Sequence, residues 1–204
     1  MHAEWSAECS ADDPVLVVPW QDPTGKSAFI DLRANPYDFD SIAEAEQHPP
    51  LMQALRALNA TRSPVFTAKC DAWPLGPDEI AHQQTNLDEA APTDPAFAGF
   101  ARPAHGFASY IDLLWREPSV FTSFQKQERI LRRLTRLAAA LDHPSAVLEC
   151  ILRPAVIDLD GAREGYAVSL YVKALGPDPH TAELEWAAAL NSIVALLRSK
   201  ELIA

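Results

Sequence analysis

The chain is poor in the residues that build the best-known catalytic and cofactor motifs. Its 204 residues include only 7 glycines and 3 cysteines. It contains no Gly-x-Ser-x-Gly elbow, no P-loop and no Gly-x-Gly-x-x-Gly turn, which are the signatures of α/β hydrolases, P-loop NTPases and dinucleotide-binding folds. Cys9, Cys70 and Cys150 lie far apart and form no Cys-x-x-Cys pair. We therefore expect no cofactor and no metal site.

Long apolar runs are also missing. No stretch approaches the roughly 20 apolar residues that a membrane-spanning helix needs. The N-terminal sequence MHAEWSAECSADD is acidic and lacks the apolar region of a secretory signal. We therefore expect a cytoplasmic protein without membrane contacts, in which residues 1–13 form a disordered lead-in.

Basic residues are scarce in the first half of the chain. The formal net charge is −11, and such a field repels phosphate backbones, so we expect no nucleic-acid partner. Residues 1–105 hold 16 acidic and 6 basic residues, whereas residues 106–204 hold 12 and 11. The predicted helix 123–141 has a basic face, formed by Lys126, Arg129, Arg132, Arg133 and Arg136. We interpret this face as solvated, and an acidic protein partner at Arg129–Arg136 is the sharper alternative.

Hydrophobic periodicity predicts alternating strands and helices. Residues 15–20 and 27–32 read as a hairpin around a Pro/Gly turn, because both are rich in β-formers. Further strands are predicted at 63–73, 107–115, 146–158 and 165–175, and helices at 51–60, 123–141 and 180–200. The proline-rich segment 74–105 is expected to be a long irregular connection with a short helix at 78–84.

An internal repeat is the most informative pattern. Phe29-Ile30-Asp31-Leu32 resembles Tyr110-Ile111-Asp112-Leu113, and a shared Pro-x-x-Phe-x-Ser spacing follows in both copies. The copies span about 27–73 and 108–155, each with strand, helix and strand. We therefore predict a single α+β domain with a ferredoxin-like antiparallel sheet built from two tandem βαβ repeats. The helices would cover one face, with an extra N-terminal hairpin strand and a C-terminal strand–helix.

Asp31 and Asp112 occupy equivalent places in the two copies. In a fold with an approximate twofold axis they would approach one another, and paired carboxylates can divide acid and base roles or bind a hard cation. The simpler interpretation is that each pairs with a basic side chain across the sheet.

One face of the predicted sheet mixes aromatic and charged side chains. Strand alternation places six candidate residues on the face away from the helices: Lys69, Asp71, Trp73, Tyr110, Asp112 and Arg153. The leading hypothesis is a binding or interaction protein that homodimerises through this face. The alternative is a small-molecule-binding or enzymatic domain, with a cleft between the face and the 74–105 segment.

Overall fold

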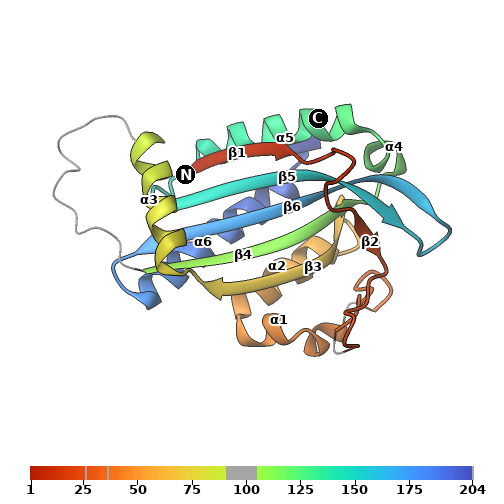
Figure 1. The fold of residues 1–204 in the computed structure, drawn as a ribbon, viewed down its shortest axis with the longest axis horizontal. Coiled ribbons are helices and arrows are strands. Elements are labelled where there is room, and N and C mark those ends of the chain that lie inside the picture. Colours follow the sequence, from red (N-terminus) through yellow and green to blue (C-terminus); the bar gives the residue numbers. More distant parts are fainter. Residues whose placement is uncertain (26, 36, 91–104, 204) are drawn as a thin grey trace.

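The computed structural model describes residues 1–25, 27–35, 37–90 and 105–203 (Figure 1). These residues form a mixed α+β fold with a six-stranded sheet. The strands are β1 (His2–Ala7), β2 (Leu16–Val18), β3 (Val65–Pro74), β4 (His105–Trp115), β5 (Ala146–Ile157) and β6 (Arg163–Gly176). The helices are a 3-10 turn η1 (Asp38–Ser41), α1 (Ala43–Gln47), α2 (Pro49–Asn59), α3 (Pro77–Ala90), α4 (Pro118–Phe121), α5 (Phe124–Ala139), α6 (Pro179–Leu197) and α7 (Lys200–Ile203).

The sheet is mixed, which corrects the purely antiparallel prediction. Its strand order is β1-β5-β6-β4-β3, and β2 pairs with the far end of β5. Along the order β3-β4-β6-β5, each strand is antiparallel to the next. Strands β1 and β2 run parallel to β5. Because β4 and β5 are both antiparallel to β6, they are parallel to each other. The unit β4–α5–β5 is therefore a βαβ unit that is split by β6.

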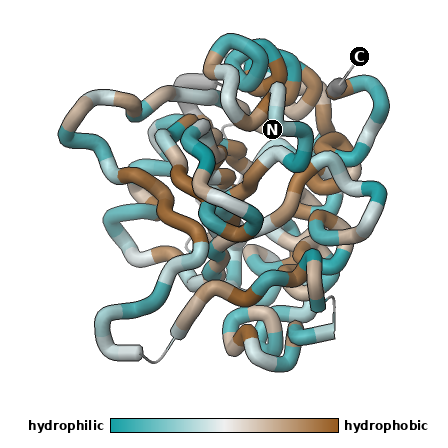
Figure 2. The backbone as a smooth tube through the Cα atoms, turned by 90° about the vertical axis from the view of Figure 1, so that its right-hand side faces the viewer, coloured by the Kyte–Doolittle hydropathy of each residue, from teal (hydrophilic) through white to brown (hydrophobic). Residues whose placement is uncertain are grey.

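Three helices, α2, α6 and α5, cover one face of the sheet, and α3 crosses the other (Figure 1). The predicted helix at 123–141 is confirmed as α5, whose buried stripe includes Leu131, Leu134 and Ala138. Ser123 begins this helix by accepting a hydrogen bond from the Lys126 backbone N–H. The hydrophobic stretches gather inside and the outer loops are mostly hydrophilic (Figure 2). The core therefore lies between the sheet and this helical layer.

Helix α6 is the centre of the helical layer. It contacts β6, β4 and α2, and its Trp186 side chain is fully buried. The indole Nε1–H of Trp186 donates a 2.9 Å hydrogen bond to Ser109 Oγ on β4. Within the described ranges, no helix has both the length and the apolar character needed to cross a membrane, and the cytoplasmic location stays a prediction.

The predicted disordered lead-in at 1–13 is wrong, because His2–Ala7 forms the edge strand β1. Ala3 and Trp5 pack against the core, and the terminal ammonium donates to the Leu141 carbonyl oxygen at 2.9 Å. Strand β1 alternates apolar residues facing the core with polar residues facing out. The short polar sequence of β1 does not indicate a strand by itself, and pairing with β5, about 145 residues away in the chain, stabilises it.

The predicted strand at 27–32, the first strand of the first repeat, is also wrong. The described residues there form a loop with a single antiparallel bridge between Gln21 and Ala28. Leu32 is nevertheless buried, so the apolar alternation reflects a packed loop. The neighbouring edge strand β3 has a register irregularity between Thr67 and Cys70, and such bulges discourage the addition of a further strand.

The first part of segment 74–105 contains more regular structure than the sequence predicts. Residues Pro77–Ala90 form the 14-residue helix α3, longer than the short helix predicted at 78–84. Glu79 accepts a hydrogen bond from the Gly76 N–H at the start of this helix. The remainder, 91–104, lies outside the described residues. The remaining predicted strands and helices are confirmed within a few residues at their ends.

Candidate functional site

The face of the sheet opposite α2, α5 and α6 is the candidate site. Helix α3 covers one end of it, through a small apolar cluster that includes Leu75, Ala108 and Leu175. The loop that carries Trp20 approaches the other end, where the Trp20 indole N–H donates to the Ala68 carbonyl oxygen at 2.9 Å. The predicted site residues lie on the strands of this face, and Trp73 packs against the α3 cluster at its edge. We call this uncovered region the open face.

Three aromatic rings form a row across the open face. The ring centroids of Trp73 and Tyr110 are 6.3 Å apart, and those of Tyr110 and Tyr171 are 5.8 Å apart. The rings come from the neighbouring strands β3, β4 and β6, and Tyr110 is directly opposite Tyr171 in the register. Burial raises the pKa of both tyrosines, so both hydroxyls remain protonated at neutral pH.

Asp112 lies beside this aromatic row and is only 8% exposed. Its carboxylate accepts a 2.6 Å hydrogen bond from Ser169 Oγ on β6. Among the described residues, no cationic group lies within 4.0 Å of it. Burial raises the pKa of Asp112, while the Ser169 hydrogen bond and the charges of Lys69 and Arg153 oppose that rise. The open face therefore contains a nearly buried carboxyl group without an ion-pair partner.

The two predicted cations of the site already have other partners. The Lys69 ammonium lies 5.0 Å from the centroid of the Trp20 ring, and Arg153 forms a 3.0 Å ion pair with Glu8. The second predicted carboxylate, Asp71, accepts a hydrogen bond from its neighbouring Ala72 N–H. Neither cation thus neutralises Asp112 by direct contact.

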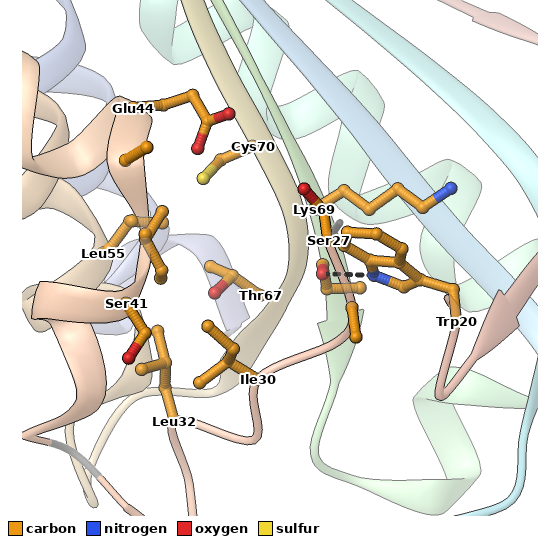
Figure 3. A pocket seen from close by; sticks show the side chains of 14 residues that line it. Trp20, Ser27, Ile30, Leu32, Ser41, Glu44, Leu55, Thr67, Lys69 and Cys70 are labelled. Atoms are coloured by element: carbon orange, nitrogen blue, oxygen red, sulfur yellow. Dashed lines mark hydrogen bonds between the residues drawn. The ribbon is translucent and has the colours of Figure 1, made fainter. Parts of the chain in front are cut away.

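A cavity of about 400 Å³ adjoins the open face at the free edge of β3 (Figure 3). Lys69 and Trp20 lie on one side of the strand, and Thr67 and Cys70 lie on the other (Figure 3). The wall of the cavity is mainly apolar with a few polar groups, and includes Trp20, Ser27, Ile30, Ser41, Glu44 and Leu55. Of the cavity wall, the sequence predicted only Lys69 as a site residue. The other wall residues come from the loop that was predicted to be a strand, from η1, α1 and α2, and from β3 itself.

The Cys70 thiol in this cavity is not a nucleophile at neutral pH. Burial raises its pKa to about 12, and the nearby carboxylates of Glu44 and Asp71 add to this effect. Cys150 is fully buried, and burial raises its pKa as well. Cys150 thus belongs to the hydrophobic core, and the partly buried Cys70 packs against that core.

The two aspartates of the repeat have different surroundings. Asp31 forms a bidentate pair with Arg33, with distances of 2.9 and 2.8 Å, on the loop that replaces the predicted strand. Asp112 is held by Ser169 on the sheet. The interpretation of a pair with a basic side chain across the sheet fails for both, because Asp31 pairs with Arg33 within its own loop and Asp112 has no ion pair among the described residues. Among the residues that the structure describes, no cluster of three or more His, Cys, Asp or Glu side chains has the arrangement of a metal site.

The basic face of α5 is partly engaged within the chain. Arg132 pairs with Glu128 at 2.9 Å and lies over the Trp5 ring of β1, 5.4 Å from its centroid. Arg129 donates to the carbonyl oxygen of Gln125. An acidic partner at Arg129–Arg136 stays a prediction.

Comparisons of the chain with protein-family models, with curated proteins and with solved structures gave no match.

Proposed function

We propose that this chain is a binding protein whose open face holds a small organic cation, a protonated amine joined to a flat or apolar body. The observation that carries the proposal is Asp112. Its carboxyl group is nearly buried, hydrogen-bonded by Ser169 and without an ion-pair partner among the described residues.

The energetics of Asp112 favour a functional role. A buried carboxylate without a cation destabilises the folded state, and groups of this kind cluster at functional sites. An amine that binds beside Asp112 supplies the missing positive charge. Binding of the amine therefore relieves the energetic cost of the unpaired carboxylate.

The aromatic row explains why the partner is an amine on an apolar body. Ammonium groups are attracted to the faces of Trp and Tyr rings. Tyr110 and Tyr171 lie near the Asp112 carboxylate, and Trp73 extends the aromatic row beyond Tyr110. Asp71 adds a second negative charge close to Tyr110. An anionic ligand finds less support, because Glu8 neutralises Arg153 and the Lys69 ammonium lies over the Trp20 ring.

The experiment compares two probes of similar size and opposite charge. Calorimetric titration at pH 7 should detect binding of phenethylamine and none of phenylacetate. The variant Asp112→Asn keeps the shape of the side chain and removes its charge, so we expect amine affinity to fall about tenfold or more. The exposed Asp12→Asn variant is the control and should bind as the wild type does. Equal binding of both probes, or unchanged amine affinity in Asp112→Asn, would overturn the proposal.

A second copy of the chain is the alternative occupant. The open face carries both carboxylates and cations, and the charges of Lys69 and Arg153 act on Asp112. A second copy related by a twofold axis could therefore set its cations against these carboxylates. Helix α3 stands on the same face and leaves less flat surface for this packing. Light scattering decides between the occupants, because a dimer that Asp112→Asn dissociates supports the second copy.

We also infer a ferredoxin-like arrangement, on the strength of the order β5-β6-β4-β3 and the split β4–α5–β5 unit. In this interpretation β3 fills the edge position that a strand after α6 would otherwise occupy. The edge strand thus precedes the βαβ unit in the chain. Duplication of 27–73 and 108–155 stays a proposal about the origin of the sequence.

A further inference from the structure

A second cavity, of about 260 Å³, lies at the end of the sheet where β3 begins and β4 ends. The turn between β5 and β6 and the short helix α4 close it. Three arginines from three segments line it, Arg33, Arg116 and Arg163, together with the single carboxylate of Asp160. This concentration of positive charge is unexpected in a chain whose net charge is −11.

Arg116 is the central cation of this cavity. Its Nε–H donates to the Val65 carbonyl oxygen at 3.0 Å and its Nη2 donates to the Asn59 carbonyl oxygen at 2.9 Å. These two bonds fix the guanidinium without neutralising it, and no carboxylate within the described ranges forms an ion pair with it. Burial and the charge of Arg33 lower the pKa of Arg116, while the charge of Asp31 opposes this shift.

The other two arginines differ in how far they are neutralised. Arg33 forms a bidentate pair with Asp31 and stacks on Phe66, 4.5 Å from the ring centroid. Arg163 is exposed at the start of β6 and has no ion pair in the described part of the chain. Arg116 and Arg163 therefore supply unneutralised charge, and Arg33 adds a positioned guanidinium.

The aromatic walls complete the site. The Phe66 ring contacts both the Arg33 and the Arg116 guanidinium groups, 4.5 and 5.9 Å from its centroid. The Trp115 indole is 5% exposed, and its Nε1–H has no hydrogen-bond partner among the described residues. Apolar walls reduce the local dielectric and strengthen the attraction between the arginines and an anion.

We infer that this cavity binds the phosphate group of a small molecule. Guanidinium groups match phosphate oxygens in geometry and charge. Arginines that converge from three segments suit a tetrahedral dianion better than a planar carboxylate, which a single arginine can bind. The site goes beyond the proposed amine site, because the two share no residue.

The test uses inorganic phosphate as the probe and Trp115 as the reporter. Nitrogen-15 correlation spectra resolve the indole N–H signals, and the variant Trp115→Phe identifies the one that belongs to Trp115. Titration with phosphate at constant ionic strength should shift this signal in a saturable manner. Parallel titrations use acetate, to test a carboxylate ligand, and chloride, as the control. Both should shift the Trp115 indole signal much less than phosphate does.

Charge variants make the test specific. We expect Arg163→Gln to weaken phosphate binding about threefold to tenfold, without effect on folding because its side chain is exposed. Asp160→Asn removes the one carboxylate of the wall and should strengthen binding about twofold to fivefold. Arg198→Gln, exposed at the end of α6, should change nothing. A saturable shift that ignores Arg163→Gln and Asp160→Asn would show an adventitious ion only, and no shift would also overturn the inference.

Discussion

Ser169 donates a 2.6 Å hydrogen bond to the carboxylate of Asp112, its direct neighbour across β6 and β4. Both side chains are buried, yet they lie on the face of the sheet that the main helical layer leaves uncovered. Within the described ranges, this small hydroxyl group provides the one direct hydrogen bond to a carboxylate that no cation contacts. This pair is the centre of the site that we propose.

The first prediction concerns pH. Because the pKa of Asp112 is raised on folding, the folded state binds more protons than the unfolded state between the two pKa values. The free energy of unfolding therefore falls as the pH rises through this window, which begins near the ordinary pKa of aspartate. Asp112→Asn should abolish this loss and raise the unfolding free energy at pH 7 by roughly 1 kcal/mol. Urea unfolding from pH 3 to pH 8 measures both effects, and parallel curves would contradict the account.

The second prediction concerns Asn59, which connects α2 to the irregular part of β3. Its Nδ2 donates to the Leu55 carbonyl oxygen and to Thr67 Oγ1, and its Oδ1 accepts from the Thr67 N–H. Asn59→Ala leaves these buried groups unpaired, so we expect a loss of about 2–4 kcal/mol in unfolding free energy. Asn191→Ala, exposed on α6, is the matched control and should cost little. Similar losses in the two variants would refute this role.

The third prediction concerns the buried contact between Trp186 and Ser109. Ser109→Ala leaves the indole N–H of Trp186 unpaired, and we expect a cost of about 1–3 kcal/mol. In a Trp186→Phe background the same substitution should cost clearly less, because no donor remains. Denaturation of the four proteins of this double-mutant cycle measures the difference. Additive costs would show that the hydrogen bond contributes nothing.

The fourth prediction concerns β1. Because Trp5 packs on the core and under Arg132, Trp5→Ala should lower the unfolding free energy by roughly 1–3 kcal/mol. Glu4→Ala, on the exposed side of the same strand, should have little effect. A Trp5→Ala variant as stable as the wild type would restore the disordered lead-in that the sequence predicts.

Local patterns in the sequence predict most elements between residues 49 and 203. Helix α5 has a clear apolar stripe, and β4, β5 and β6 alternate or run apolar between turn residues, so each shows its structure in its own sequence. The sequence mispredicts strand β1 and the loop 27–35 for opposite reasons. Strand β1 depends on a parallel partner far away in the chain, whereas the loop buries Leu32 without forming a strand.

The candidate site, too, is only partly predictable from the sequence. Strand alternation is sufficient to place Tyr110, Asp112 and Trp73 on one face, and the structure brings them together. The Asp112–Ser169 contact depends on the register between β4 and β6, which alternation alone does not determine. The sequence does not predict the arginine cavity, because Arg33, Arg116 and Arg163 lie far apart in the sequence and come together only in the fold.

The most direct measurement is the pKa of Asp112 itself, followed by carbon-13 NMR of its carboxyl group with and without saturating phenethylamine. In the free protein the account predicts a pKa above the usual value for aspartate. Bound amine places a positive charge beside the carboxylate, so the pKa should fall. An Asp112 pKa that does not respond to bound amine would contradict the proposed function.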